Sequence, residues 1–260
     1  MNAHGIFYFM DIQFICYNGK MVLKDQAVLT SDNRSFKYGD GVFETMKWKG
    51  DRIVLGHYHF ERLFTSLTLI QINAQSISTD VLIKAIAELC SLNNCIELAR
   101  VRLTVYRGES NKAEYLIEAT PIETNIADWN EKGLTIDLHP YVRKNRDVFA
   151  NLKTANYLPY VMAELYREQR GLDECLVLNT CNNICDGAKS NIFLLMDKEI
   201  YTPALHQGCI NGVLRRFIID ELKKNKYTIK QTTVSVEMLQ QANEVILTNA
   251  IRGVKWVEVF

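Results

Sequence analysis

A lysine in an apolar setting is the first residue of this chain whose type and surroundings could do chemistry. Lys153 lies in Ala150 to Val161, which reads ANLKTANYLPYV, between a small residue and an apolar run typical of a helix start. Burial disfavours the ammonium, lowers the pKa of the amine and leaves a nucleophile that can form an imine. The ordinary alternative is a lysine that extends from a helix start into water.

Two further segments suit a bound phosphate. Arg62 follows His59 by one turn on the polar side of a predicted helix. A guanidinium fork matches phosphate oxygens, although a lone helical arginine is commonly a solvated surface residue. Residues 208–216 (GCINGVLRR) run from a glycine-containing loop into a helix, whose first amides lack partners and carry partial positive charge. Taken alone, this segment indicates only a helix start.

A carboxylate and a glycine-containing segment complete the candidates. Asp186, in NNICDGAKSNIF, ends an apolar strand and is either a turn residue or a carboxylate held beside a cationic ring nitrogen. Residues 32–45 (DNRSFKYGDGVFET) contain two glycines that permit a tight backbone path. Tyr38 and Phe43 project from this path into a pocket, or the segment is a simple structural turn.

The elements that must position these residues follow from the spacing of apolar residues. Alternation predicts hairpins over 12–24 and 42–55, and helical spacing predicts helices over 57–73 and 80–92. Further strands are expected at 96–106, 113–119, 133–142, 174–179, 182–186, 190–196, 227–234, 244–248 and 254–259. Further helices are expected at 155–170, 211–224 and 236–241. Strands in adjacent pairs without βαβ alternation predict an α+β protein.

Composition limits the class of protein. The 260 residues include 30 basic and 30 acidic side chains, so net charge gives no case for nucleic acid or an acidic membrane surface. No window approaches the length of a membrane span. Seven cysteines without paired spacing predict reduced thiols in a cytoplasmic protein and no metal site. The polar stretch 121–130 predicts a linker between a small N-terminal α/β domain (1–120) and a larger C-terminal domain (131–260) that contains Lys153.

Six segments, in order, resemble the class IV aminotransferases, which are the fold-type IV pyridoxal-phosphate enzymes. They span about residues 17–257 and read DNRSFKYGDGVFET, HFERL, LKTANYLP, DGAKSNIF, YTPALHQGCINGVLRR and ANEVILTNAIRGVKWV. The resemblance implies pyridoxal 5'-phosphate as cofactor and a small-molecule substrate with an amino group. It also implies a small domain followed by a pseudo-barrel domain, in a homodimer whose active site takes residues from both chains.

The resemblance also implies roles for individual residues. Lys153 matches the lysine that binds the cofactor covalently and moves protons at the substrate carbon, and Tyr157 matches a residue near the ring oxygen. The residues matching phosphate contacts are Arg62, the backbone of Gly212, Val213 and Leu214, and the turn at Asn249 and Ala250. Those matching the substrate pocket are Tyr38 and Phe43, with Arg102 or Arg107 on a substrate carboxylate unless these are exposed strand arginines.

One position departs from the family pattern. Asp186 stands where the family has glutamate, which pairs with the pyridine nitrogen and keeps the ring protonated. Aspartate is one methylene shorter, and Lys189 nearby competes for its charge. We expect the change to affect catalytic strength more than cofactor binding.

Two segments favour a particular reaction. LKTANYLP resembles the LKT-x-N form found in 4-amino-4-deoxychorismate lyases, and LTNAIRGVKWV resembles their TNA turn. The expected activity is therefore release of pyruvate from aminodeoxychorismate to give 4-aminobenzoate. The alternatives are a branched-chain or D-amino acid aminotransferase, and a catalytically weak relative that serves as a binding module.

Overall fold

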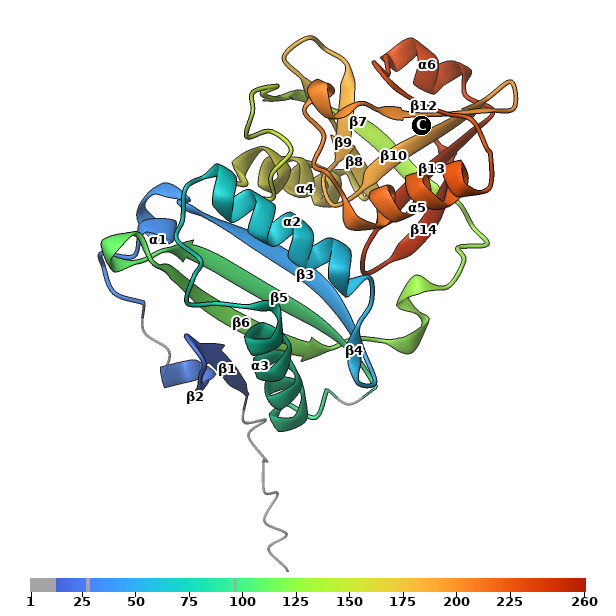
Figure 1. The fold of residues 1–260 in the computed structure, drawn as a ribbon. Helices are drawn as coiled ribbons and strands as arrows, with labels where there is room; N and C mark the ends of the chain where they lie inside the picture. The colour runs from blue at the N-terminus through green and yellow to red at the C-terminus, as the bar shows by residue number, and fades with distance from the viewer. Residues whose placement is uncertain (1–12, 27–28, 96) are drawn as a thin grey trace, which may run out of the picture.

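The computed structural model describes residues 13–26, 29–95 and 97–260, and these build two β-sheets with helices packed on them (Figure 1). The sheet nearer the N-terminus has the strand order β2-β1-β6-β5-β3-β4. Its strands are β1 (Phe14–Tyr17), β2 (Lys20–Leu23), β3 (Gly41–Lys49), β4 (Arg52–Ile53), β5 (Leu98–Arg107) and β6 (Ala113–Pro121).

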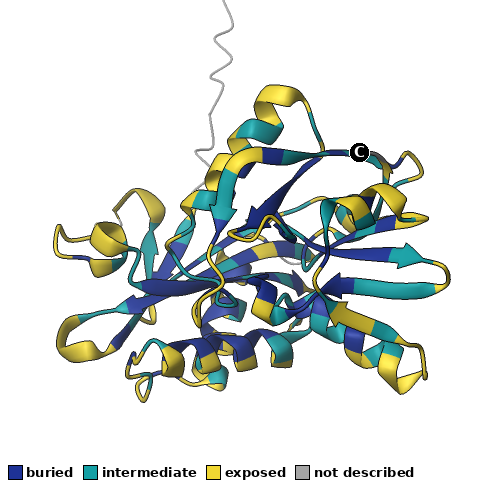
Figure 2. Ribbon diagram, turned by 90° about the horizontal axis from the view of Figure 1, so that it is seen from above, coloured by how far each residue is buried: buried dark blue, intermediate teal, exposed yellow. Residues whose placement is uncertain are grey.

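Three helices belong to this sheet: α1 (Arg34–Tyr38), α2 (Gly56–Leu69) and α3 (Thr79–Leu92). Helix α2 packs on β3, and α3 packs on β1 and β6. Apolar side chains of α2 and α3 face those of the strands, so one continuous core forms between them. Figure 2 shows the buried residues concentrated along the strands and the exposed residues at loops and on outer helix faces.

The second sheet has the strand order β12-β11-β10-β13-β14-β7-β8-β9. Strand β7 runs parallel to both β14 and β8, while β10, β13 and β14 pair antiparallel. The strands are β7 (Leu134–Lys144), β8 (Glu174–Asn179), β9 (Ile184–Gly187), β10 (Asn191–Met196), β11 (Glu199–Pro203), β12 (Ile229–Thr232), β13 (Glu244–Asn249) and β14 (Gly253–Val259).

Helices α4 (Leu158–Arg170), α5 (Val213–Lys224) and α6 (Val236–Gln241) accompany this sheet. The N-terminal sheet with its helices and the C-terminal sheet with its helices form the two halves of the protein. Helix α5 of the C-terminal half packs on β13 and also against α2 of the N-terminal half. Two polar contacts join these two helices: Tyr58 donates to Asp220 at 2.9 Å, and Arg216 pairs with Glu61 at 3.0 Å. The α2–α5 contact therefore fixes the two halves beside each other.

The predicted α+β class is confirmed, and nearly all predicted elements are present. Helix α4 begins at Leu158 and not at residue 155, because Thr154 forms a bridge with Val42 and Ala155 donates to the Gly41 carbonyl. Helix α1 and strand β11 were not predicted. None of the helices built from the described residues is long and apolar enough to cross a membrane.

Candidate active site

The lysine segment is attached to strand β3 of the other half. The amide of Phe43 donates to the Lys153 carbonyl at 2.9 Å, and the amide of Ala155 donates to Gly41 at the same distance. These two bonds make residues 153–155 a short extension of the N-terminal sheet. Lys153, which belongs to the C-terminal part of the sequence, is thereby held at the boundary between the two sheets.

Two aromatic rings flank the Lys153 amine. Its Nζ lies 4.4 Å from the centre of the Phe43 ring and 5.0 Å from that of Tyr157, and it donates to the Tyr157 hydroxyl at 3.3 Å. Desolvation, together with the positive charge of Arg62, lowers the pKa of Lys153 to about 7, although the charge of Glu44 acts to raise it. An amine with this pKa is partly unprotonated near neutral pH and can act as nucleophile or base.

Arg62 is held in a buried ion pair. On α2 it donates from Nε to Glu44 Oε1 at 2.7 Å and from Nη2 to Glu44 Oε2 at 2.5 Å. His59, one turn earlier, places Nδ1 2.6 Å from the same carboxylate. Burial acts to raise the pKa of Glu44, but the charge of Arg62 and the hydrogen bonds from His59 and Arg62 outweigh it and lower that pKa to about 2.

The guanidinium of Arg62 lies at the start of α5. Its Nη1 donates to the Asn211 carbonyl at 3.0 Å, one residue before Gly212, the N-cap of α5. These three bonds leave two of the five N–H groups of the guanidinium without a partner among the described residues. No side chain caps α5, so its first amides are also open to an anion.

Gly212 is required where it stands. A Cβ at this position would lie 1.7 Å from Asn191 Oδ1, a distance no side chain could tolerate. Asn191 cannot easily yield, because its Nδ2 donates to both the Asp186 carboxylate and the Ile210 carbonyl. The glycine therefore lets the α5 start approach strand β10 closely.

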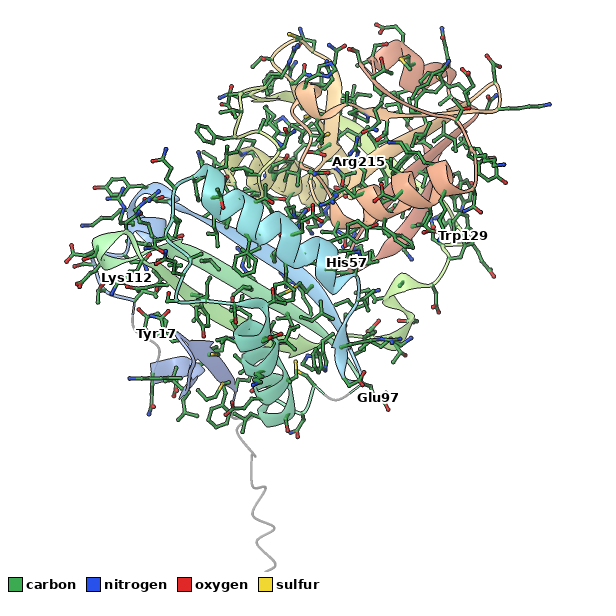
Figure 3. All side chains as sticks on the ribbon, in the orientation of Figure 1. Tyr17, His57, Glu97, Lys112, Trp129 and Arg215 are labelled. Carbon is green, nitrogen blue, oxygen red and sulfur yellow. The ribbon has the colours of Figure 1, made fainter. Side chains whose placement is uncertain are left out.

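The two arginines that follow the α5 start point elsewhere. Arg215, labelled in Figure 3, is 2 % exposed and donates to the Pro203 carbonyl and the Thr202 hydroxyl within the C-terminal half. Arg216 pairs with Glu61 on the surface. The groups at this helix start that are open to an anion are consequently backbone amides and the Arg62 side chain.

Asp186 lies in a buried polar cluster next to the α5 start. Its Oδ2 accepts from the Tyr160 hydroxyl at 2.6 Å, from the Ile210 amide at 2.8 Å and from Lys144 Nζ at 3.3 Å. Its Oδ1 accepts from Asn191 at 2.7 Å. Burial raises the pKa of Asp186, while Lys144 and the hydrogen bonds oppose that rise.

Lys189 does not compete for this carboxylate. Its Nζ pairs with Glu164 on α4 at 2.5 Å. The expectation that Lys189 competes for Asp186 is therefore wrong. The lysine that contacts Asp186 is Lys144, which precedes it by 42 positions.

The two candidate substrate arginines have different surroundings. Arg102 lies on β5, and its guanidinium is 3.9 Å from the centre of the Phe43 ring. This guanidinium makes no hydrogen bond or ion pair with a described residue. Arg107 donates to Asp40 at 2.9 and 3.2 Å and to the carbonyls of Gln71 and Ile70. Of the two, only Arg102 lies beside Phe43 with its guanidinium free to bind a carboxylate.

Three other predicted site residues lie apart from the Lys153 amine. Tyr38 ends α1 and is 66 % exposed, so within one chain its side chain faces solvent. Asn249 accepts from the amides of Ile251 and Arg252 and donates to the Lys189 carbonyl, which shapes the turn between β13 and β14. Ala250 lies in the same turn.

The donor set fits the predicted cofactor. Arg62 and the uncapped α5 start offer donors to a phosphate, and Lys153 offers an amine to an aldehyde. The Thr248 hydroxyl and His59 Nε2 are buried without a partner among the described residues. Buried polar atoms without a partner are rare and are accounted for by a bound ion, water or ligand. Asp186 offers a carboxylate to a ring nitrogen.

Sequence reasoning missed Glu44 and Lys144. Glu44 lies in the apolar strand GVFETMKWK, and a carboxylate inside such a strand was the available signal for a buried pair. Lys144 had no such signal, because it ends a strand next to further charged residues.

Comparison with known proteins gives a consistent result. A family model described as amino-transferase class IV matches residues 41–258. An aminodeoxychorismate lyase of Bacillus subtilis is 28 % identical over 249 residues, which is 91 % of this chain and 83 % of that protein. A D-alanine aminotransferase of Staphylococcus haemolyticus is 25 % identical over 241 residues, covering 89 % of this chain and 83 % of its own.

Solved structures share the fold. The branched-chain aminotransferase of the archaeon Thermoproteus uzoniensis superposes with a TM-score of 0.83 at 22 % identity, covering 95 % of this chain and 87 % of that one. Another branched-chain amino acid aminotransferase, crystallised with pyridoxamine 5'-phosphate, superposes with a TM-score of 0.82 at 22 % identity. That second match covers 95 % of this chain and 85 % of the other.

Proposed function

Because the chain belongs to the class IV amino-transferase family and is a pyridoxal 5'-phosphate enzyme, we propose that it is a 4-amino-4-deoxychorismate lyase. The reaction removes the enolpyruvyl group as pyruvate and leaves 4-aminobenzoate. The observation on which this rests is the Lys153 amine, which lies between Phe43 and Tyr157 with a pKa lowered to about 7.

Each candidate residue has a defined task in this proposal. The bound cofactor supplies an electron-withdrawing ring that stabilises negative charge on the substrate carbon. Lys153 binds the cofactor aldehyde and, once displaced by the substrate amine, takes the proton from the carbon that bears the nitrogen. The electron pair of that C–H bond expels the enolpyruvyl oxygen on the neighbouring carbon. Protonation of the released enolate on carbon gives pyruvate, and the ring double bond formed by the elimination completes the aromatic ring of 4-aminobenzoate.

The remaining contacts position the reactants. Arg62 and the first amides of α5 would bind the phosphate, and Asp186 would accept a hydrogen bond from the protonated ring nitrogen and keep it protonated. Arg102 binds a carboxylate of the substrate, because its guanidinium lies beside Phe43 without a partner among the described residues. Tyr157 hydrogen-bonds near the reacting amine.

The second candidate is transamination of a branched-chain or D-amino acid. The 25 % identity to a D-alanine aminotransferase favours it, and the Tyr157 hydroxyl beside Lys153 also suits it. A lyase needs no keto acid, whereas a transaminase returns to its starting state only when a keto acid accepts the amino group. The LKTAN and TNA segments favour the lyase.

A coupled assay separates the two reactions. We expect the purified protein to form pyruvate from aminodeoxychorismate without any keto acid, measured as NADH oxidation by lactate dehydrogenase. Lys153→Ala should form none, while Lys230→Ala, which removes an exposed lysine paired with Glu199, should match the parent. Absence of pyruvate together with rapid transfer from leucine or D-alanine to 2-oxoglutarate establishes the transaminase instead.

We further propose that the enzyme works as a homodimer in the cytoplasm. All seven cysteines are free thiols, which suits a reducing compartment. Helix α4 and its surroundings expose apolar side chains that a second copy of the chain would bury. These are Tyr141, Val148, Phe149, Leu158, Val161, Met162 and Leu165. Equilibrium sedimentation should give twice the chain mass, and Leu158→Glu with Met162→Glu should give the monomer.

A further inference from the structure

Asp186 is paired with a second buried charge that the proposed reaction does not use. Lys144, at the end of β7, is 8 % exposed. Its Nζ lies 3.3 Å from Asp186 Oδ2 and 5.0 Å from the centre of the Tyr160 ring. Asp186 is the only carboxylate among the described residues that pairs with Lys144. A buried charge is unfavourable unless it is paired, and the Lys144 ammonium is the paired cation that the buried Asp186 carboxylate has.

The donors around Asp186 leave a single acceptor position. Three groups from separate elements donate to Oδ2: Lys144 of β7, Tyr160 of α4 and the amide of Ile210 before α5. Within the described part of the chain, Asn191 of β10 alone donates to Oδ1. A carboxylate oxygen has two lone pairs, so Oδ2 is fully occupied and Oδ1 retains one.

We propose that Lys144 is a positioning residue that keeps the buried Asp186 ionised and fixes its carboxylate, so that one acceptor site on Oδ1 stays free for the cofactor ring. The assignment of that site to the ring nitrogen rests on the proposed function. The Lys144–Asp186 pair itself does not depend on it.

The other titratable groups around Asp186 cannot replace this ammonium. The nearby hydroxyl and thiol groups belong to Tyr157, Tyr160, Cys185 and Cys209. Burial raises the pKa of each of them, so all four are neutral at pH 7. Lys153 and Arg215 also interact with Asp186 electrostatically. Neither of them makes a hydrogen bond to the carboxylate.

Infrared spectroscopy of the full-length protein tests the proposal without measuring turnover. The carbonyl stretch of a protonated carboxylic acid is followed against pH, after removal of the cofactor and again after reloading. The band of Asp186 is identified by its loss in Asp186→Asn. In Lys144→Met the band should appear at a pH about 1–3 units higher than in the parent, because an opposite charge at this distance lowers a carboxyl pKa by that amount.

Lys144→Arg is the matched control, since it keeps the charge and changes the shape. We expect its Asp186 band to titrate as in the parent. The proposal is overturned if Lys144→Met titrates like the parent, or if Lys144→Arg shifts as far as Lys144→Met. If Lys144→Met does not fold, Lys144→Gln, which keeps an N–H donor without the charge, is judged by the same two outcomes.

Borohydride reduction and infrared titration distinguish the role of Lys144 from the proposed function. If borohydride does not attach the cofactor to Lys153, the proposed function fails while the infrared result on Lys144 and Asp186 still stands. If the cofactor is attached but Asp186 titrates independently of Lys144, only the present inference fails.

Discussion

Glu44 and Arg62 form a two-bond ion pair inside the protein, with Nε to Oε1 at 2.7 Å and Nη2 to Oε2 at 2.5 Å. Glu44 comes from β3 and Arg62 from α2, so the pair fixes the helix on the strand and orients the guanidinium together. The third donor, Nη1, then reaches the Asn211 carbonyl at the α5 start. A strand, a helix and a loop from both halves are thus joined at one side chain.

Arg62→Ala should weaken pyridoxal 5'-phosphate binding by about 10- to 100-fold, since charge-assisted bonds to phosphate contribute about 1.5–3 kcal/mol each. Fluorescence titration of the cofactor-free protein measures the dissociation constant. Arg52→Ala, on exposed β4, is the control and should bind as the parent does. An unchanged constant in Arg62→Ala contradicts the assignment of Arg62 to the phosphate.

Glu44→Gln should alter how stability depends on pH. The pKa of Glu44 is lowered to about 2 in the folded protein, below its ordinary value of 4.5, so the unfolded chain binds its proton first as pH falls. The stabilisation by Glu44 is therefore complete above about pH 4.5 and is lost between there and about pH 2. Removing one member of a buried pair costs about 3–5 kcal/mol, which urea unfolding at pH 7 should detect.

The pH series provides the check on this interpretation. The difference in unfolding free energy between the parent and Glu44→Gln should shrink as the pH is lowered through the acid range. The parent then loses the stabilisation by the ionised Glu44 carboxylate, which the variant does not have. A difference that stays constant over that range shows that Glu44 acts through packing and not through its charge. Glu61→Gln, which alters an exposed pair with Arg216, should leave stability nearly unchanged.

The attachment of pyridoxal 5'-phosphate to Lys153 should speed up as the pH rises through about 7. Only the unprotonated amine is a nucleophile, and desolvation, together with Arg62, lowers the pKa of Lys153 to about 7 from its ordinary 10.5. Stopped-flow absorbance of the cofactor-free protein measures the rate. A rate that instead rises only near pH 10 shows that the amine is solvated in the working protein.

Local signals predicted most of the fold correctly. The Asn18-Gly19 turn and the helical spacing of α2 and α3 are properties of neighbouring residues, and they are found where expected. Strand β11 was missed because Asp197 and Lys198 adopt the left-handed conformation at its turn without any glycine. The division into 1–120, 121–130 and 131–260 stays a prediction, although the two sheets separate in the same region.

The spacing of residues along the chain gave little information about which side chains meet at the candidate site, and the resemblance to a known family gave more. Lys153 meets Phe43 across 110 positions, and Asp186 meets Lys144 across 42, through packing that no local pattern encodes. The resemblance supplied Lys153, Arg62 and the α5 start as a set. In the structure the Asn211 carbonyl accepts from Arg62, and the Asn211 amide donates to the carbonyl of Asn151, two residues before Lys153. Their chemical roles remain predictions until the variants are measured.

Asp186→Asn should retain the attached cofactor but lose most turnover. The amide has nearly the shape of the acid and its oxygen can still accept from Tyr160, while the Lys153 amine and the Arg62 guanidinium proposed to hold the cofactor are unchanged. It has no charge with which to keep the ring nitrogen protonated, and the ring then withdraws electrons less well. The visible absorption band and the borohydride product report attachment, and the pyruvate assay reports turnover. Full activity in this variant removes Asp186 from the mechanism.

The choice between Arg102 and Arg107 for the substrate carboxylate can be made with a pair of matched variants. Arg102 lies over Phe43 with no partner among the described residues, whereas Arg107 is bound to Asp40 and to two carbonyls. Loss of a charge-assisted bond of about 1.5–3 kcal/mol predicts that Arg102→Met raises KM roughly 10- to 100-fold. Its cofactor dissociation constant should stay that of the parent. Arg107→Met should show the opposite behaviour, with a lower unfolding midpoint and a KM near that of the parent, because its bonds hold the loop around Asp40. A raised KM in Arg107→Met and a normal one in Arg102→Met would assign the substrate carboxylate to Arg107 instead.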